Sequence, residues 1–411
     1  MQVPAAPAAF DPTRRAFVVD PYPVYAELRE SAPVAWAAQT GQVLVARHED
    51  IDAVLRDRRF GRSYLQVATH ADMGRPDEPE ELAPFWDVVR DGMLDTEPPD
   101  HTRLRRLVSK AFTPARVAAL RPKVEAIAAR LVDALLDAGS DGSAVELRSA
   151  VAEPLPVAVI ADLLGVPESD RGLLLPWSHA MCRMYELHPT VDDQRGAVQA
   201  AGEFAAYLRD LAADRRLHPQ DDLVTALAEV VDEGERLTED ELVGTCVLLL
   251  NAGHEATVGV TTNGTATLLQ HPDQLERLRG DLALLPTAVE ELLRYSTPLQ
   301  LFSRWALEDA DIAGIPVPRG TQAALLFGSA NRDPARFDDP ERFDVGRTPN
   351  PHISFGAGIH YCLGAPLARL ELGAIFSELV QRVPGLAIAS EPVWGRGYII
   401  RTLEGLSVTV R

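Results

Sequence analysis

Cysteine is scarce in this chain, and long apolar runs are missing from it. The 411 residues include three cysteines, Cys182, Cys246 and Cys362, whose wide spacing offers neither a disulfide framework nor a Cys-x-x-Cys metal pair. The longest apolar stretch, residues 243–252, is interrupted by a glycine, a threonine and an asparagine, and it is too short to span a bilayer. These absences are typical of a protein of a reducing cytoplasm, and we expect no membrane association.

Basic residues are also few, because 40 lysines and arginines stand against 60 aspartates and glutamates, a net charge of −20. This deficit argues against nucleic acid or an anionic membrane as a partner. Residues 1–11 are rich in alanine and proline and lack a charged start followed by a long apolar run, so we expect this tail to be neither a signal peptide nor an anchor. The expected protein is a monomer of the cytoplasm.

No internal repeat and no low-complexity linker divides the chain, so we expect a single domain over residues 1–411. Apolar residues at helical spacing predict helices over residues 49–56, 100–109, 114–138, 149–164, 168–186, 192–216, 222–231 and 365–382. Strands are predicted over residues 33–36 and 43–46, paired as a hairpin, and over 317–320, 323–327, 386–389 and 406–410. Residues 63–92 and 331–350 are predicted to be irregular. The predicted fold class is mainly α with a minor β region.

A central helix of about 30 residues is predicted to begin at a capping box of Thr238 and Glu241 and to end near residue 270. Such a helix is about 45 Å long, enough to cross a domain. Its middle contains Asn251, Gly253 and His254, which are unusual in a core helix. We infer that another group lies against this part of the helix.

The segment with the most specific pattern is residues 355–364, where a glycine-rich loop leads through Cys362 into the helix predicted from residue 365. A helix N-terminus stabilises a thiolate, and Gly356, Gly358 and Gly364 allow a flat macrocycle to approach the backbone. Phe355 is placed to shield the sulfur from water. A lone buried cysteine is more often structural, but the whole pattern favours a metal-binding thiolate.

This loop resembles the haem loop of the cytochrome P450 family, Phe-Gly-x-Gly-x-His-x-Cys-x-Gly, which residues 355–364 match at every fixed position. The resemblance, strongest to the soluble bacterial branch, implies the P450 fold, with the long central helix over the haem. It implies haem b with Cys362 as the axial thiolate of the iron, and with Phe355 and Gly364 beside the cofactor. A cysteine thiolate donates electron density that favours O–O cleavage.

A second landmark is the pair Glu291 and Arg294, three residues apart on one face of a short helix. That helix is predicted to start at a capping box of Thr287 and Glu290. Alone, the pair is more often a solvated surface contact. With Arg342 downstream it resembles the Glu-Arg-Arg triad of the family, and the resemblance implies a structural triad that holds the haem loop.

A third landmark is the segment Ala252, Gly253, His254, Glu255, Ala256, Thr257 in the central helix. In the family, Ala-Gly-x-(Asp/Glu)-Thr lies over the iron; the small pair leaves room for oxygen, and the acid and alcohol relay protons. Here Ala252, Gly253 and Glu255 match, whereas Ala256 occupies the threonine position. Thr257 comes one residue late, a rotation of about 100°, so it should not simply replace the hydroxyl.

This departure leaves three interpretations open. A substrate hydroxyl or an ordered water takes the place of the alcohol, the enzyme wastes reducing equivalents as peroxide, or its chemistry is unusual for the family. We favour the first, because oxygen activation needs a positioned proton donor. Glu255 could also be an ordinary helix residue that is paired elsewhere.

Four further residues are implied to hold the haem propionates. His101 and Arg105 share a helix face, and Arg304 and His360 occupy matching positions downstream. Arginine suits this task because its planar fork binds a carboxylate through two hydrogen bonds. Each residue alone would more often be a surface charge.

Five basic residues stand out in this acidic chain: Arg103, Arg105, Arg106, Lys110 and Arg116. The resemblance places them on the docking face for an acidic ferredoxin, although charge runs are usually solvated. No flavin or nicotinamide fingerprint occurs in the sequence. Electrons are therefore expected from NAD(P)H through a ferredoxin reductase and a ferredoxin.

The substrate pocket implied by the resemblance includes Met181, Leu249, Leu299 and Phe302, which by themselves are more often core residues. The predicted function is that of a monooxygenase, which activates O2 and oxidises a small organic substrate. Two alternatives remain open, a peroxide-driven peroxygenase and a non-catalytic haem carrier or sensor.

Overall fold

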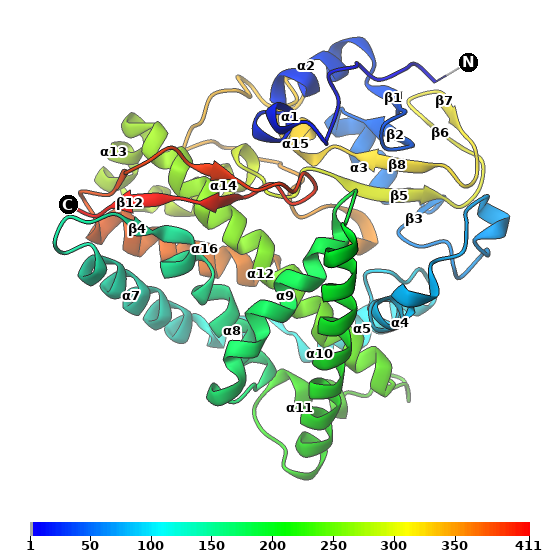
Figure 1. The fold of residues 1–411 in the computed structure, drawn as a ribbon, viewed down its shortest axis with the longest axis horizontal. Coiled ribbons are helices and arrows are strands. Elements are labelled where there is room, and N and C mark those ends of the chain that lie inside the picture. Colours follow the sequence, from blue (N-terminus) through cyan, green and yellow to red (C-terminus); the bar gives the residue numbers. More distant parts are fainter. Residues whose placement is uncertain (1–2) are drawn as a thin grey trace. The chain divides into compact units, whose positions relative to one another are not determined.

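The computed structural model of the protein describes residues 3–411, which form two compact units, each assembled from separate stretches of chain. Unit 1 comprises the residues up to Gly61 together with Glu125–Ala152 and Ala256–Arg411, and unit 2 comprises Arg62–Val124 and Glu153–Glu255. The longest described helix, α12 (Glu239–Gln270), contributes its first half to unit 2 and its second half to unit 1 (Figure 1). The predicted fold class is confirmed, whereas the single domain stays a prediction.

Unit 1 contains a five-stranded sheet with the strand order β1-β2-β8-β5-β3. Its strands are β1 (Val34–Ala37), β2 (Gln42–Val45), β8 (Gln322–Leu325), β5 (Phe302–Ala306) and β3 (Phe60–Gly61). β2 and β8 are parallel and the other neighbours are antiparallel, so the predicted hairpin of β1 and β2 is confirmed. Of the predicted N-terminal tail, Ala5 forms a parallel bridge with Trp36 of β1, whereas Met1 and Gln2 lie outside the described residues.

Three smaller sheets also belong to unit 1. They pair β4 (Val145–Glu146) and β9 (Ala387–Ile388) with β12 (Ser407–Thr409), β10 (Val393–Trp394) with β11 (Leu403–Gly405), and β6 (Ala310–Ile312) with β7 (Ile315–Val317). The strands predicted near residues 388 and 408 are confirmed. The strand predicted over 317–320 is wrong in position, because β7 ends at Val317, before Pro318.

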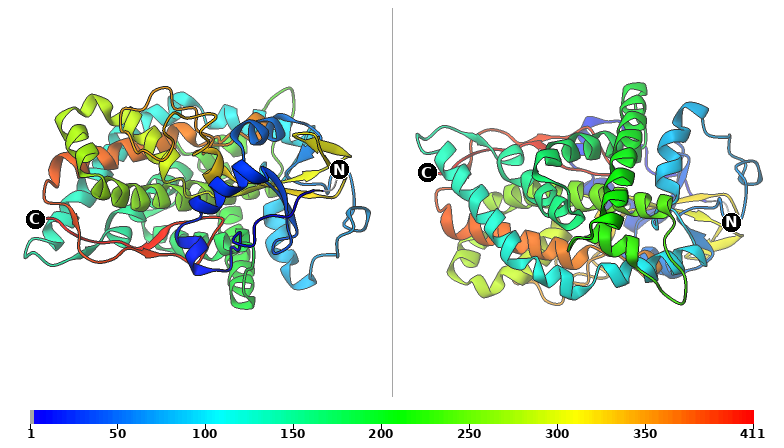
Figure 2. Two further views of the ribbon diagram at one scale, coloured as in Figure 1. Left: turned by 90° about the horizontal axis from the view of Figure 1, so that it is seen from above. Right: turned by 90° about the horizontal axis from the view of Figure 1, so that it is seen from below.

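Besides the second half of α12, unit 1 contains several further helices. They are α1 (Arg15–Val19), α2 (Tyr22–Ser31), α3 (His48–Arg56), most of α7 (Arg121–Ala138), α13 (Pro272–Gly280), α14 (Leu285–Tyr295), α15 (Phe327–Ala330) and α16 (Ala365–Arg382). The bounds of α16 are those predicted. α16 lies beside α12 so closely that a Cβ atom at Gly264 would be 2.9 Å from the Phe376 ring (Figure 2).

Unit 2 is helical apart from its loops. Its helices are α4 (Ala83–Arg90), α5 (Asp100–Ala111), α6 (Pro114–Ala119), α8 (Pro154–Leu164), α9 (Leu174–Cys182), α10 (Val191–Leu217) and α11 (Leu223–Glu229). α9 packs along α10 (Figure 1). Between them the rings of Trp177 and Phe204 stack with their centroids 5.1 Å apart. The predicted capping box of α12 is confirmed, because the backbone N–H of Thr238 donates to the Glu241 carboxylate at 2.8 Å.

Short helical turns complete both units. Six are 3₁₀ turns, Ala71–Met73, Glu80–Leu82, Glu168–Leu173, Arg183–Tyr185, Leu282–Leu284 and Gly358–His360, and Arg148–Ala152 is a π-helical turn. Among the described residues, none of the helices combines the length and the apolar character that a membrane crossing needs.

Proline explains why three predicted helices are interrupted. Residues 114–138 form α6 and α7, with Pro122 in the first turn of α7. Pro154 likewise begins α8, and Pro176 lies in the first turn of α9. A proline has no N–H to donate and its ring clashes with a preceding helical turn, so it fits the start of a helix and not the middle.

Two other local predictions are wrong. The stretch 63–92 was expected to be irregular, but it contains α4, whose Phe85 and Val89 are buried one turn apart. The capping box of Thr287 and Glu290 does not form, because α14 begins at Leu285. The Thr287 hydroxyl donates instead to the carbonyl oxygens of Leu284 and Val345.

Candidate active site

Cys362 lies three residues before α16, which begins at Ala365 directly after the loop. The backbone N–H of Cys362 donates to the Phe355 carbonyl at 3.0 Å, which closes the loop on itself. Cys362 is half-buried, whereas Cys182 and Cys246 are buried, and burial raises the pKa of both of these thiols, that of Cys246 to about 12. Cys182 and Cys246 therefore stay protonated at neutral pH, and the helix N-terminus favours a thiolate at Cys362.

The glycines of this loop serve two different purposes. Gly358 has a φ of +69°, and a Cβ atom there would be 2.2 Å from the carbonyl oxygen of Leu55, so the chain path itself requires a glycine. A Cβ atom at Gly356 would meet nothing closer than 4.0 Å, and one at Gly364 would be 3.9 Å from the sulfur of Cys362. The backbone beside the thiol is thus open enough for a flat group.

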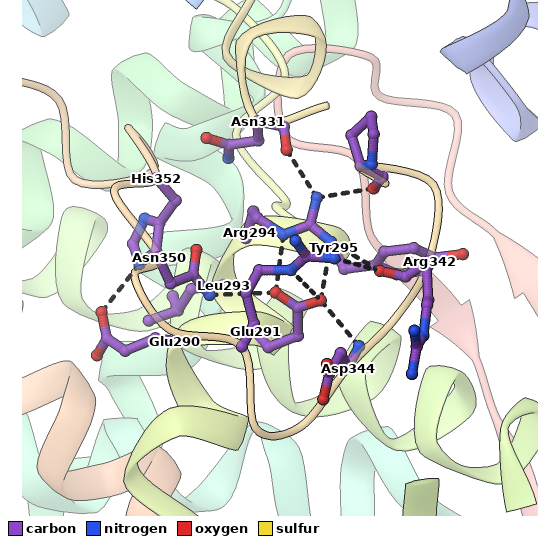
Figure 3. A network of polar contacts seen from close by, with 12 residues as sticks. Glu290, Glu291, Leu293, Arg294, Tyr295, Asn331, Arg342, Asp344, Asn350 and His352 are labelled. Carbon is purple, nitrogen blue, oxygen red and sulfur yellow. Dashed lines mark hydrogen bonds and ion pairs between the residues drawn. The ribbon is translucent and has the colours of Figure 1, made fainter. Parts of the chain in front are cut away.

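The predicted pair of Glu291 and Arg294 is present in α14, and both side chains are fully buried. Arg294 donates two hydrogen bonds to the Glu291 carboxylate, at 2.7 and 2.8 Å (Figure 3). Its remaining N–H groups reach the carbonyl oxygens of Asn331 at 2.8 Å and Pro340 at 2.9 Å. The pair therefore fastens the irregular stretch 331–350 to α14.

The prediction that Arg342 is the third member of this group is wrong. The side chain of Arg342 is exposed, and only its carbonyl oxygen takes part, as an acceptor from Arg294 at 3.2 Å (Figure 3). Arg347 takes the place, because its Nε lies 3.1 Å from the Glu291 carboxylate. We call Glu291, Arg294 and Arg347 the Glu291 cluster.

A second set of contacts, which the sequence did not reveal, starts from the neighbouring residue Glu290. Its carboxylate accepts hydrogen bonds from Arg369 of α16 at 2.6 and 2.8 Å. It also lies 2.9 Å from His352 Nε2 (Figure 3). Burial alone would raise the pKa of Glu290, but hydrogen bonds from Arg369 and His352 lower it to about 2. Arg369 also stacks on the Phe355 ring at 4.5 Å, so Glu290 of α14 is connected to the cysteine loop through Arg369.

Asn331 and Ser354 join these contacts directly to the loop. The Asn331 side chain donates to the Ser354 hydroxyl at 2.8 Å and accepts from the N–H of Ile353 at 2.9 Å. The Ser354 hydroxyl in turn donates to the carbonyl oxygen of Leu293 at 2.7 Å. The residues directly before the cysteine loop are thereby attached to Asn331 and to α14.

Along the middle of α12, Ala252 and Ala256 are exposed and one turn apart, whereas Thr257 is buried. The small exposed residues leave one face of this helix uncovered, which suits a flat ligand. The Thr257 hydroxyl is hydrogen-bonded to Glu371 of α16, on another side of α12. This contact agrees with the expectation that Thr257 does not replace the missing hydroxyl.

Comparison with known proteins settles the family of a chain with this loop and these contacts. The profile described as Cytochrome P450 matches residues 70–383. The chain belongs to the cytochrome P450 family. The cytochrome P450 monooxygenase PikC of Streptomyces venezuelae is 42% identical over 404 residues, which cover 96% of this chain and 92% of PikC.

Two further P450 relatives carry more specific names. The 6-deoxyerythronolide B hydroxylase of Saccharopolyspora erythraea is also 42% identical, over 95% of this chain and 96% of the hydroxylase. The solved structure of PksS, a P450 of the bacillaene polyketide synthase of Bacillus subtilis, has a TM-score of 0.87 at 37% identity, covering 98% of this chain and 99% of PksS. The chain is a P450 monooxygenase, and members of this family bind haem through a cysteine thiolate.

The residues predicted to hold the haem propionates of this P450 lie in different units. In unit 2, His101 is buried on α5 and Arg105 follows one turn later, half-buried. In unit 1, His360 ends the 3₁₀ turn before Cys362, and Arg304 is buried on β5. Arg304 donates to the Ser303 carbonyl and lies 4.9 Å from the Phe302 ring. Their role toward a haem carboxylate stays a prediction.

The basic cluster expected to receive a ferredoxin is largely neutralised within unit 2. Arg103 pairs with Glu241, while Arg106 and Lys110 both pair with Asp232. Arg116 lies 3.6 Å from Asp221. Acidic residues distant in sequence fold against these side chains, and the role of the cluster as a ferredoxin docking face stays a prediction.

The four predicted pocket residues differ in accessibility. Met181 is fully buried, and its sulfur accepts a hydrogen bond from the Asn251 side-chain amide at 3.7 Å. Leu249 is also buried. Leu299 and Phe302 are half-buried and pack against the hydrophobic core that the strands of the five-stranded sheet contribute to. Leu299 and Phe302 are therefore the better candidates for substrate contact, and all four roles stay predictions.

Glu371 gives this P450 a pH-dependent stability. Burial raises its pKa from 4.5 to about 8, and the hydrogen bond from Thr257 only partly opposes this rise. Because Glu371 ionises more easily in the unfolded chain, its contribution is complete below pH 4.5 and is lost as the pH rises through about 8. Between pH 5 and pH 8 we expect the free energy of unfolding of the wild type to fall by ~3–4 kcal/mol relative to that of Glu371→Gln. Denaturant unfolding of both proteins measures this difference. A constant difference across this range would show that Glu371 ionises normally.

Proposed function

We propose that this P450 monooxygenase inserts one oxygen atom of O2 into an organic substrate, and that the thiolate of Cys362 would hold the iron of haem b. The observation that supports this assignment is the half-buried Cys362 in the open glycine loop before α16, while Cys182 and Cys246 are buried thiols of raised pKa. Bound haem supplies the activation of oxygen with two electrons from outside the chain. The residues of the chain hold the haem in place and deliver protons beside it.

On the Cys362 side, the chain has to keep the thiolate in place and limit water. We propose that Phe355 shields the sulfur, since its ring is fixed by Arg369 at 4.5 Å. The Glu291 cluster fixes the stretch that leads into this loop. Hydrogen bonding and hydrophobic shielding around a ligand tune a metal as much as the ligand itself.

On the α12 side, the proposed proton donor is the carboxyl group of Glu255, with Gly253 and Ala252 leaving space beside it. Ala256 has no hydroxyl, and Thr257 is bonded to Glu371 instead. We propose that a hydroxyl of the substrate, or a water ordered by it, completes the proton route from Glu255. A positioned donor of this kind contributes about 10²–10⁴-fold to a rate.

The names of two relatives suggest a substrate class. PksS is named for a polyketide synthase and another relative is named as the hydroxylase of 6-deoxyerythronolide B. We infer that the substrate of this chain is a hydroxyl-bearing polyketide or a compound of similar polarity. The half-buried Leu299 and Phe302 are the proposed apolar contacts.

The experiment that tests this function compares two oxidant systems on one polyketide panel. With ferredoxin, ferredoxin reductase, NAD(P)H and O2 we expect a product that carries one added oxygen atom. With hydrogen peroxide alone we expect at least ~10-fold less product, because the proton route of Glu255 serves O2 and not a peroxide that arrives protonated. Higher turnover with peroxide would establish the peroxygenase alternative, and a haem spectrum without turnover in either system would favour a sensor.

Coupling of electrons to product tests the role of Ala256. For a substrate with a hydroxyl near the reacting carbon, we expect about tenfold more product per NAD(P)H than for its deoxy analogue. The variant Ala256→Thr restores an alcohol on α12, so the difference between the two substrates should shrink. Equal coupling of both substrates by the wild-type enzyme would exclude proton delivery by the substrate.

A further inference from the structure

Two histidines and two glutamates of unit 2 gather where α9 meets the first half of α12. His179 lies on α9, His254 and Glu255 are consecutive on α12, and Glu153 directly precedes α8. The Nε2 atom of His179 is 3.3 Å from the Glu255 carboxylate and 3.5 Å from that of Glu153. The Nδ1 atom of His254 is 3.9 Å from the same Glu255 oxygen.

The donor atoms of His179, His254 and Glu255 all lie within 4.8 Å of one another. His254 is fully buried, and about a third of the His179 side chain is exposed. The two imidazole rings tilt at 44° with centroids 5.2 Å apart. This is a compact set of nitrogen and oxygen donors, with His179 open to solvent as a route of entry.

An ordinary ion pair does not account for the position of His179. A protonated imidazole between two carboxylates forms charge-assisted hydrogen bonds of about 2.7–2.9 Å. The Nε2 atom of His179 is buried, yet it makes no hydrogen bond to any residue that the structure describes. Its separations of 3.3 and 3.5 Å from carboxylate oxygens are instead close to the ~3.3 Å between ligand atoms that are each 2.0–2.1 Å from a tetrahedral zinc ion.

We propose that His179, His254 and Glu255 form a binding site for a divalent transition-metal ion, with Zn²⁺ as its best occupant. Glu153 adds a second negative charge beside the ion and is within reach of the fourth position. Imidazole nitrogens favour zinc and its neighbours, whereas Mg²⁺ and Ca²⁺ prefer sites made of oxygen alone. In the bound state the Nδ1 atom of His254 faces the ion, and the Ser178 hydroxyl, 3.2 Å away, turns to another acceptor.

The site is separate from the haem thiolate, since its ligands come from α9 and α12 of unit 2 and Cys362 belongs to unit 1. It shares Glu255 with the proton route proposed above. A bound ion and a proton therefore compete for the same carboxylate, although the binding itself does not depend on that route. Zinc binding can be measured without any turnover.

The test measures zinc bound by tag-free holoprotein after equilibrium dialysis against ZnCl2 in millimolar Mg²⁺. We expect about one zinc ion per chain in the wild type and none at this site in His179→Ala. Glu153→Gln keeps the shape of its side chain and should bind zinc more weakly. Elemental analysis distinguishes zinc from the haem iron, so the iron content reports the folded fraction in each sample.

His218→Ala is the matched control, because His218 forms an exposed pair with Asp214 at 3.0 Å and has no second histidine beside it in that pair. This variant should retain the wild-type zinc content. Equal zinc in the wild type and in His179→Ala would overturn the proposal. Loss of wild-type zinc to Mg²⁺ would also overturn it, because that result would indicate an acidic surface and not a histidine site.

Discussion

Replacing Cys362 by alanine should abolish the long-wavelength Soret band that the reduced carbon monoxide complex of a thiolate-ligated haem shows. Product formation should fall by ~10³-fold or more, equivalent to ~4 kcal/mol of the activation barrier. The reason is chemical, because the thiolate donates the electron density that favours cleavage of the O–O bond. An imidazole or water ligand in its place does not provide this donation. The measurement is a reduced carbon monoxide spectrum together with product analysis.

The other two cysteines are matched controls in the same chain. Cys182→Ala and Cys246→Ala remove thiols that are buried and whose pKa values burial raises. Both variants should keep the thiolate spectrum, although loss of buried volume will lower their stability. A thiolate band that persists in Cys362→Ala, or disappears in Cys246→Ala, would indicate that a residue other than Cys362 is the ligand.

The features that the sequence predicted well are those encoded within one short segment. The ten residues 355–364 contain the thiol, the glycines and the aromatic shield, so their spacing alone defined the loop. α16 matched its predicted bounds, because Gly364 precedes it and an apolar face persists to Arg382. The capping box of Thr238 and Glu241 likewise depends on residues three apart.

The features that the sequence predicted poorly depend on how distant segments meet. Four arginines, Arg332, Arg336, Arg342 and Arg347, lie in one irregular stretch, and spacing could not decide which of them reaches Glu291. The turn through residues 338–347 exposes Arg342 and brings Arg347 inward. Nothing in the local sequence distinguishes these two outcomes.

The ion-pair partners of charged residues could not be predicted from the sequence for the same reason. Glu290 was assigned to a capping box because Thr287 precedes it by three residues, yet it pairs with Arg369, which is 79 residues away. Asp232 neutralises Arg106 and Lys110 from more than 120 residues away. A run of like charges in sequence therefore says little about the net field at the surface until its partners are known.

Arg294→Ala should be the most destabilising single change in the Glu291 cluster. It leaves the fully buried Glu291 carboxylate without its two shortest hydrogen bonds and also frees the carbonyl oxygens of Asn331 and Pro340. Breaking a buried pair by removing one partner costs ~3–5 kcal/mol. We expect a loss of this size in urea unfolding of the holoprotein, with reduced haem retention, because the stretch that leads to Cys362 loses its attachment.

Alanine variants of Arg347 and Arg342 then test which of these two arginines is the third member of the cluster, as seen in the structure or as implied by the sequence. Arg347→Ala removes one contact to Glu291 and hydrogen bonds to three carbonyl oxygens, so an intermediate loss of ~1–3 kcal/mol is expected. Arg342→Ala removes an exposed side chain and should change stability by no more than ~0.5 kcal/mol. If Arg342→Ala were as damaging as Arg294→Ala while Arg347→Ala was neutral, the triad implied by the sequence would be correct after all. The opposite order would show that the third arginine has moved five residues along the chain, to where the turn before Cys362 can reach α14.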